Sequence, residues 1–396
     1  MFNQDRFRVT HVGSLARPVE LQTFLRAQEN GESYDRDAFA DCLRESVVEV
    51  VRRQHEIGVD FVSDGEFGKT QTWAWYVRDR LTGFEERPLP PSELVGPRDP
   101  SRLGEDRRAF ADFYADYFGR NPVAEGVREH GIAVCTGPIR YSGQEAIQRD
   151  IENLKHAMAQ AGAEHGFLPV VAPSSAVPIR VDEHYPSEEE FIFALADALN
   201  EEYRAIVDAG LYVQIDDAYM ATMYDNMVPP GTIADYRAWA ELRVQALKRA
   251  LHGIPTDRSR YHVCWGSWNG PHSTDIPLRE IVDLILQVPV GGYALEQANP
   301  RHEHEWRVWQ DIALPDDRVL IPGLISHATN VLEHPELVAE RIVRLAELVG
   351  RERVIAGTDC GFAQTPYITR VHPSLIWAKL QSLVEGAQIA SARMWP

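Results

Sequence analysis

Short apolar segments alternate with longer segments of helical periodicity along most of this chain. Phe39, Leu43, Val47 and Val51, for example, recur at the three- to four-residue spacing of an amphipathic helix. The predicted helices span about residues 36–58, 188–209, 233–252 and 335–349, and each ends at or just before a glycine. Ser187, with Glu190 three residues later, predicts a capping box at the start of the second of these helices.

The apolar segments between these helices read as buried strands of a parallel sheet, because many are rich in β-branched residues and lack a polar face. The predicted strands are residues 10–14, 60–66, 132–139, 167–174, 211–217, 260–266, 292–298, 319–326 and 354–360. Strands that alternate with helices over this length predict an α/β fold, and we expect a (β/α)8 TIM barrel formed by residues 1–396 as a single domain. A doubly wound open sheet is the alternative.

One predicted strand is more than a barrel of eight requires. We assign residues 132–139 as the extra strand, because they follow a long polar stretch, residues 77–131, that we interpret as an insertion after the second strand. Residues 88–100 within it are rich in proline. We expect loop and helix there, beside the mouth of the barrel.

Composition and charge exclude several classes of protein. The chain has 396 residues, no apolar run long enough to span a membrane and no signal peptide at its start. Its net charge of −19 argues against broad binding to nucleic acid or anionic membranes. Four cysteines are too few for a disulfide framework. We therefore expect a cytoplasmic protein with small-molecule partners and free thiols, and a homo-oligomer is compatible with this composition.

Polar residues gather where the predicted strands end. They are Ser14, Asp64, Glu66, Asp216, Asp217, His262, Cys264, Glu296 and Cys360. Active sites of (β/α)8 barrels are built at the carboxyl ends of the strands. Acids and thiols are costly to bury there unless they are paired, so this end is the predicted site.

Four of these residues have the chemistry of a zinc site. His262 and Cys264 are two apart on one strand, so their side chains project to the same face. Glu296 and Cys360 end two later strands. Two thiolates, one imidazole and one carboxylate suit tetrahedral Zn²⁺. An isolated His-x-Cys pair is more often a pair of ordinary core residues, and the wide spacing of these four is weaker evidence than a CxxC motif.

The motifs together resemble the catalytic barrel of cobalamin-independent methionine synthase, and more closely the single-barrel members of that superfamily. The matching segments run in order along nearly the whole chain: HVGSLARP (11–18), SDGEFG (63–68), QIDDAYM (214–220), HVCWG (262–266), LEQANPRHEHEW (295–306) and GTDCGF (357–362). The resemblance implies that His262, Cys264, Glu296 and Cys360 are zinc ligands. It also implies that Ser14, Glu66 and Asp216 hold an amino-acid substrate.

Three features depart from the family pattern. There is room for one barrel only, which puts binding of a polyglutamylated folate in doubt. The histidine expected after the seventh strand is displaced, because His327 is followed by Ala328 at the matching position. Trp73, Trp75 and Tyr76 form an aromatic cluster after the second motif, and we interpret it either as core packing or as a face toward the substrate.

The implied reaction is methyl transfer to homocysteine, giving methionine. Zinc would lower the pKa of the substrate thiol, with Glu296 as the labile ligand. A donor such as 5-methyltetrahydrofolate needs a general acid, and His327 and Asp217 are the candidates. His11 could contact substrate or be structural. His302 and His304 are weaker metal candidates, and hydrogen bonding near Glu296 is their alternative.

Other functions remain as alternatives. A related epoxyalkane:coenzyme M-type transferase would use a thiol that carries a sulfonate, which favours a cation such as Arg17 over Glu66 and Asp216. A decarboxylase of tetrapyrrole acids shares the barrel but needs no metal. A noncatalytic role in metal storage is a further alternative. The zinc set beside Glu66 and Asp216 favours an amino-acid thiol.

Overall fold

A parallel β-sheet forms the centre of the protein in the computed structural model, which describes residues 1–88, 104–120, 131–177 and 180–395. Seven strands pair in the order β1-β4-β6-β7-β8-β9-β10, and every neighbouring pair is parallel. The strands are β1 (Phe61–Ser63), β4 (His165–Val171), β6 (Tyr212–Asp216), β7 (Ser259–Val263), β8 (Gly292–Leu295), β9 (Val319–Ile325) and β10 (Gly357–Thr358). Each falls within or beside a predicted strand, so the parallel α/β arrangement is confirmed.

The predicted strand at residues 10–14 is wrong as a strand. The chain there makes one isolated parallel bridge, between Val9 and Ala356. The Thr10 N–H donates to the Ala356 carbonyl (2.8 Å) and the Asp60 N–H donates to the Val9 carbonyl (2.9 Å). The Phe61 N–H also donates to the Val9 carbonyl (3.2 Å), so backbone bonds from residues 8–10 reach the residue before β10 and the start of β1, at the two edges of the sheet.

Side chains interrupt the ladder beyond this point. The Val12 N–H donates to the Thr358 hydroxyl (3.2 Å), and the Gly13 N–H donates to Nδ1 of His11 (3.1 Å). Gly13 also has a φ of 132°, a conformation that strands do not use. The local sequence thus turns the chain where the apolar pattern predicts that a strand continues.

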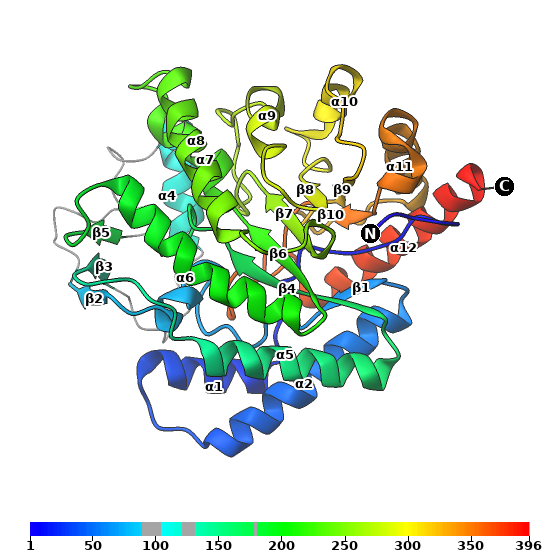
Figure 1. Ribbon diagram of the computed structural model, residues 1–396. Coiled ribbons are helices and arrows are strands. Elements are labelled where there is room, and N and C mark those ends of the chain that lie inside the picture. Colours follow the sequence, from blue (N-terminus) through cyan, green and yellow to red (C-terminus); the bar gives the residue numbers. More distant parts are fainter. Residues whose placement is uncertain (89–103, 121–130, 178–179, 396) are drawn as a thin grey trace.

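Helices surround the sheet (Figure 1). The long ones are α1 (Val19–Asn30), α2 (Arg36–Glu56), α5 (Gln144–Ala161), α6 (Glu188–Asp208), α8 (Ile233–Ala250), α11 (Pro335–Val349) and α12 (Pro373–Met394); shorter ones are α7 (Tyr219–Met227), α9 (Val282–Ile285) and α10 (Val308–Asp311). The four predicted helices are confirmed as α2, α6, α8 and α11. Ser187 caps α6 by accepting from the Glu190 N–H (3.2 Å), which is one of the two hydrogen bonds of the predicted capping box.

The alternation of side chains along each strand divides the core in two. Val62, Leu168 and Val213 belong to the larger cluster that packs beneath the helices. The residue before each of them points to the other face of the sheet. Those residues belong to a second apolar cluster inside the curved sheet, which consists of Phe61, Phe167, Tyr212, Ala294, Val319, Ile321 and Ile355. Asp216 shares the face of Tyr212, so the inner face changes from apolar to polar toward the carboxyl ends of the strands.

The residues assigned as the extra strand lie outside the central sheet. β3 (Ile132–Cys135) pairs with β2 (Phe84–Arg87) and β5 (Arg180–Asp182) in a separate three-stranded sheet. Two short helices, α3 (Glu105–Ala109) and α4 (Ala111–Arg120), lie in the described part of the predicted insertion. Residues 89–103 and 121–130, with most of the proline-rich stretch, are outside the described residues.

Asp106 anchors this insertion against the chain that follows β7. Its Oδ1 accepts from the Ser273 N–H (2.8 Å), and its Oδ2 accepts from the Tyr114 hydroxyl. Trp268 Nε1 donates in turn to the same Tyr114 hydroxyl (3.0 Å). The described part of the insertion therefore lies against the segment that follows the predicted metal ligands.

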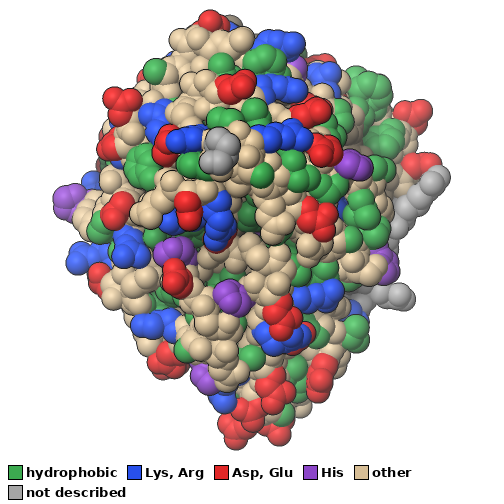
Figure 2. Space-filling view, turned by 90° about the vertical axis from the view of Figure 1, so that its right-hand side faces the viewer, with side chains coloured by type: hydrophobic (Ala, Val, Ile, Leu, Met, Phe, Trp, Pro, Cys, Tyr) green, Lys and Arg blue, Asp and Glu red, His purple; other side chains and the backbone are tan. Residues whose placement is uncertain are grey.

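Acidic and basic side chains are interspersed over the face shown in Figure 2, without one large basic patch, and acidic side chains gather at its lower edge. This distribution agrees with the excess of acids over bases in the sequence. Among the described helices, none has the length and apolar character that crossing a membrane requires.

Candidate metal centre and substrate cavity

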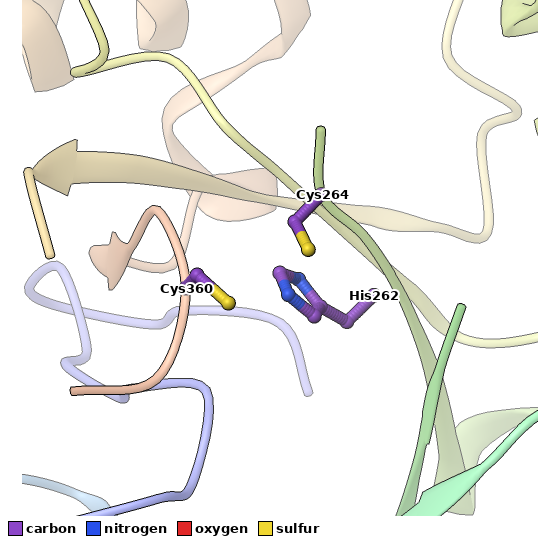
Figure 3. Close-up of side chains that lie close together, drawn as sticks. All are labelled: His262, Cys264 and Cys360. Atoms are coloured by element: carbon purple, nitrogen blue, oxygen red, sulfur yellow. The ribbon is translucent and has the colours of Figure 1, made fainter. Parts of the chain in front are cut away.

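Three predicted ligands meet at the carboxyl ends of the strands. His262 lies on β7, Cys264 follows directly after it, and Cys360 comes from the turn after β10. Their ligand atoms all lie within 4.8 Å of one another, and both sulfur atoms point toward the imidazole (Figure 3). The three residues are 2%, 4% and 7% exposed. We refer to His262, Cys264 and Cys360 as the metal-ligand group.

Nothing in the described protein satisfies the imidazole of this group. Neither Nδ1 nor Nε2 of His262 has a hydrogen-bond partner, although buried polar atoms are nearly always paired. Burial lowers the pKa of His262, so its ring is neutral, as a metal ligand must be. The Cys360 thiol beside it and burial raise the pKa of Cys264. An imidazole with both nitrogens unpaired, beside two thiols, fits a borderline-soft cation.

Glu296, the predicted fourth ligand, is fully buried beside this group but is not part of it. Its Oε1 accepts from the Trp265 N–H (3.2 Å), and its Oε2 accepts from the Asn299 amide (3.3 Å). Burial and the nearby Asp359 raise the pKa of Glu296. The carboxylate is therefore held by the residue that follows Cys264.

The metal-ligand group forms part of the wall of a cavity of about 180 Å³. The wall residues are Val12, Ser14, Glu66, Trp73, Asp216, Ala218, Tyr219, Thr222, His262, Cys264, Gly266, Ser267, Trp268, Cys360, Gly361 and Gln364. Ser14, Glu66 and Asp216, which the sequence resemblance implies as substrate contacts, line the same cavity as the three candidate ligands.

Ser14 is held close to the turn that carries Cys360. The Phe362 N–H donates to the Ser14 carbonyl (2.9 Å), and the Ala363 N–H donates to the Ser14 hydroxyl (3.4 Å). A Cβ at Gly361 would collide with the Ser14 hydroxyl. Glycine at position 361 therefore allows the Ser14 hydroxyl to approach this turn.

Glu66 occupies a strained backbone position after β1. Its φ is 62°, which is unusual for a residue other than glycine. The Glu66 N–H donates to Asp64 Oδ1 (2.9 Å), and Lys69 Nζ donates to Glu66 Oε1 (2.8 Å). Sequence reasoning missed Lys69, although its i,i+3 spacing from Glu66 was a usable signal. The buried ion pair keeps the Glu66 carboxylate from being an isolated charge.

The two consecutive aspartates at the end of β6 point to opposite sides of the sheet. Asp216 lines the cavity and accepts from the Gln214 amide (2.7 Å). Burial raises the pKa of Asp216 to about 7. Asp217 points away from the cavity wall, so only the first of the two lies where it could meet substrate.

Asp217 is the centre of a fully bonded cluster. Its Oδ1 accepts from the Ser174 and Ser175 hydroxyls (2.6 and 2.7 Å) and from the Met220 N–H (3.3 Å), and its Oδ2 accepts from the Tyr261 hydroxyl (2.8 Å). We refer to these five residues as the Asp217 cluster. Tyr261 precedes His262 on β7, so the strand alternation that directs His262 into the cavity directs Tyr261 into this cluster.

The two histidines proposed for the site lie outside the cavity wall. His11 is buried, with Nε2 2.7 Å from the Gln54 amide oxygen and Nδ1 accepting from the Gly13 N–H. His327 is also buried, and neither ring nitrogen has a partner among the described residues. Burial lowers the pKa of His11 to about 4 and that of His327 to about 3. Both rings are thus neutral at neutral pH, and His11 has no nitrogen left for a substrate.

His302 belongs to a separate buried network below Trp265. Its ring packs against the Trp265 indole with 4.4 Å between centroids, tilted by 34°. Nδ1 lies 2.9 Å from Glu305 and Nε2 lies 2.9 Å from Asp275. Burial opposes its charge, but these two carboxylates raise the pKa of His302 to about 10. His304 is exposed, so neither histidine joins the metal-ligand group.

The aromatic cluster after β1 divides between two environments. Trp73 packs against Cys264, Cys360 and Ala218 and lines the cavity. Tyr76 instead donates a hydrogen bond to Glu202 (3.4 Å) and is buried away from the wall. Trp75 does not line the cavity either. Only the first of these three aromatic residues faces the site.

The chain is similar in sequence to proteins of known name over most of its length. No known family model matches the chain. The methionine synthase of Thermococcus kodakarensis is 22% identical over 379 residues, which cover 96% of this chain and 91% of that protein. The 2-hydroxypropyl-CoM lyase of Xanthobacter autotrophicus is 23% identical over 380 residues, which cover 89% and 86%.

A solved structure has the same overall fold. The B12-independent methionine synthase from Shewanella sp. W3-18-1, in complex with selenomethionine, superposes with a TM-score of 0.69 at 18% identity, covering 98% of this chain and 99% of that chain. The comparisons of sequence and of structure thus confirm the resemblance of this chain to the cobalamin-independent methionine synthases.

Proposed function

We propose that the protein is a zinc-dependent thiol alkyltransferase that methylates homocysteine to methionine. The observation that carries the proposal is one cavity wall that contains both the metal-ligand group and the three polar residues Ser14, Glu66 and Asp216. Relatives named methionine synthase support the same reaction.

The residues present fit zinc, and the unpartnered nitrogens of His262 are the main reason. His262, Cys264 and Cys360 would hold the ion, and Glu296 would be its fourth, exchangeable ligand from its position beside Trp265. Zinc, when bound, would lower the pKa of a substrate thiol into the neutral range.

The chain's own polar side chains would orient homocysteine. Asp216 and Glu66 would accept hydrogen bonds from the substrate ammonium, and the Ser14 hydroxyl would donate to its carboxylate. Lys69 already occupies one oxygen of Glu66, so the ammonium would share this carboxylate with the lysine. Asp217 and His327 lie outside the wall, and the proposal assigns neither of them the role of general acid.

Coenzyme M is the second candidate acceptor, suggested by the 2-hydroxypropyl-CoM lyase among the relatives. A sulfonate needs a cation, and Arg17 was the predicted one. In the structure its guanidinium donates to the backbone carbonyls of Glu66 and Ala363 and does not line the cavity. The wall carries two carboxylates instead, which favours the ammonium of an amino-acid thiol.

Two broader expectations accompany the function. We propose that residues 8–10 close the sheet into the predicted (β/α)8 barrel and that the chain is a single catalytic domain, because these residues bond at both edges of the sheet. We also propose a reducing compartment such as the cytoplasm, because all four cysteines are unpaired and two of them would have to remain free to bind metal.

Removal of the two carboxylates tests the acceptor. A charge-assisted hydrogen bond contributes roughly 1.5–3 kcal/mol, so Glu66→Gln or Asp216→Asn should lower kcat/KM for homocysteine by about 10- to 150-fold. With 3-mercaptopropionate, which has no ammonium, the same variants should lose little. Zinc content, measured in parallel, should stay unchanged. Equal losses with both thiols would refute the amino-acid acceptor, and improved use of coenzyme M would favour the second candidate.

A further inference from the structure

We propose that the alkyl donor of this enzyme is an onium compound, a methylsulfonium or a methylated quaternary ammonium, whose charged methyl group rests against Trp73 and Tyr219. The inference rests on the proposed thiol transfer and names its second substrate. It is based on three features of the cavity: its aromatic walls, the sign of its charges and the acidity of its protonated groups.

Trp73 places an aromatic surface at the reacting centre. It packs against Cys264 and Cys360, the two thiols of the metal-ligand group. Trp268 and Tyr219 line the same cavity from the segment after β7 and from the start of α7. The face of an aromatic ring carries negative charge density and attracts onium groups, which is how aromatic cages bind methylated ammonium ligands.

The Trp268 ring is held in place before any ligand arrives. Its indole stacks on His272 with 4.4 Å between centroids and an interplanar angle of 21°, and the Arg107 guanidinium lies over the ring, 5.8 Å from its centroid, so Trp268 shapes the wall and the onium contact falls to Trp73 and Tyr219. Its Nε1 donates to the Tyr114 hydroxyl (3.0 Å). A Cβ at Gly266 or at Gly270 would collide with the indole. A wall fixed in this way loses little entropy when it binds a ligand.

The charges of the wall also favour a cation. Glu66 and Asp216 are its acids, and neither lysine nor arginine is among the described residues that line it. Lys69 lies behind Glu66, buried, with Nζ bonded to Glu66 Oε1 and to the Pro169 carbonyl (3.0 Å). Both acids are assigned to the acceptor's ammonium, so a cationic donor is favoured by the absence of lysine and arginine from the described wall: nothing there repels a cationic donor or neutralises a carboxylate-bearing one.

Protonated groups on the wall are too weakly acidic for an amine leaving group. With Glu66 and Asp216 engaged by the acceptor's ammonium, the other oxygen acids of the described wall are the hydroxyls of Ser14, Tyr219, Thr222 and Ser267. Tyrosine ordinarily has a pKa near 10, and burial raises the pKa of Tyr219 further. A donor such as 5-methyltetrahydrofolate, whose amine must be protonated as it leaves, lacks a suitable acid here.

An onium donor removes this requirement. The acceptor thiol loses its proton to solvent, and its sulfur attacks the methyl carbon. A new S–CH3 bond forms as the bond between that carbon and the onium sulfur or nitrogen breaks. The bonding electron pair neutralises the positive charge, so a neutral thioether or tertiary amine leaves without a proton. Charge and atoms balance with no further reactant.

Ligand binding tests the site without turnover. Choline and 3,3-dimethylbutan-1-ol have the same shape but differ in charge, and their affinities can be measured by calorimetry with zinc-loaded protein. A cation–π contact contributes about 0.5–2 kcal/mol, so Trp73→Leu should weaken choline binding by about 2- to 30-fold and leave the alcohol unchanged. Trp73→Phe should retain most of the choline affinity. Trp75→Leu is the matched control, because Trp75 lies outside the wall, and it should behave as wild type.

Turnover then separates the candidate donors. With homocysteine as acceptor, methionine should form from S-methylmethionine, trimethylsulfonium or glycine betaine, and the arm that works identifies the sulfonium or the ammonium class. 5-Methyltetrahydrofolate and methylcobalamin should be poor donors. Methyl iodide needs no donor site and reports thiol activation alone.

The outcomes distinguish the onium donor from the proposed thiol alkyl transfer on which it rests. Zinc-dependent methylation by methyl iodide, without any from the onium donors, would overturn the inference and leave the thiol alkyltransferase standing. No zinc-dependent methylation from any donor would overturn both. Choline and the alcohol weakened equally by Trp73→Leu would also overturn the inference, because the ring would then act only as an apolar surface.

Discussion

Two buried polar groups lie on opposite sides of the same two strands and differ in how they are satisfied. In the Asp217 cluster, four donors converge on one carboxylate. In the metal-ligand group, both nitrogens of His262 lack a partner among the described residues. Both groups depend on strand alternation at β6 and β7. The difference teaches that the Asp217 carboxylate is satisfied within the chain, whereas an unpaired imidazole that converges with two thiols leaves its ligand atoms available to a metal ion.

The strongest way to sharpen this comparison is to remove a ligand of the metal-ligand group. Purified wild type should carry about one zinc per chain, and Cys264→Ser or Cys360→Ser should lose nearly all of it by elemental analysis. Zinc at about 1,000 times its Kd should stabilise the wild type by about 4 kcal/mol, and that gain should vanish in both variants. Cys135→Ser is the control, because Cys135 is buried elsewhere and its thiol donates to the Gly137 carbonyl. Full zinc retention in either ligand variant would refute that assignment.

The second prediction concerns removal of the carboxylate that accepts the hydrogen bonds of the Asp217 cluster. Asp217→Ala leaves the Tyr261, Ser174 and Ser175 hydroxyls without their acceptor, and a buried unsatisfied group costs about 1–3 kcal/mol. Rotation of the hydroxyls recovers part of this loss, so we expect a destabilisation of roughly 2–4 kcal/mol by urea unfolding. Zinc content should be unchanged. In the metal-free protein, His262→Ala should cost clearly less, since that imidazole has no hydrogen bonds to lose. A comparable cost for both would contradict the distinction between the two groups.

The smallest expected effect is a pH dependence of stability that arises from His302, whose ring is paired with the carboxylates of Asp275 and Glu305. The pKa of His302 is about 10 in the folded protein and about 6.5 when unfolded. Its stabilising contribution is therefore complete below pH 6.5 and is lost as pH rises toward 10. Between pH 7 and 8 the loss should be about 1 kcal/mol.

Chemical unfolding at both pH values measures this dependence. The charged or titratable groups around the His302 ring are Asp275, Glu305 and Glu296, and His272 shares Asp275. His302→Gln should remove most of the extra slope. A slope that is the same in wild type and variant would show that His302 does not change its protonation on unfolding.

Much of the fold could be predicted because its signals are local. The helices begin and end at caps and glycines, and buried strands are recognisable from apolar runs. Residues 10–14 were misassigned because their N–H groups bond to side chains such as Thr358, over 300 positions away, and an apolar pattern does not record such partners. The small sheet of β2, β3 and β5 was missed because β2 (FEER) and β5 (RVD) are short and polar, so no apolar run marks them. The exclusion of residues 132–139 from the main sheet was correct.

The candidate site divides in the same way. Strand parity predicts that His262 and Cys264 share a face, and the structure adds Cys360 to them. The same alternation of side chains along a strand also separates Asp216 from Asp217. The expectation that Asp217 could be the general acid overlooked this signal. Lys69 and Trp268 were not anticipated, because their positions follow from turns after β1 and β7 and not from a repeating pattern.

The wide separation of the metal ligands along the chain has a consequence for biosynthesis. Cys264 and Cys360 are nearly 100 positions apart, and the bridge between Val9 and Ala356 joins residues almost 350 positions apart. A chain growing from the ribosome has His262 and Cys264 long before Cys360 exists, and the bridge between Val9 and Ala356 forms only when almost the whole sequence is present. An ion held by the three proposed ligands would therefore be captured tightly only by a chain that has nearly finished folding. Metal loading should follow the assembly of the sheet and cannot nucleate it.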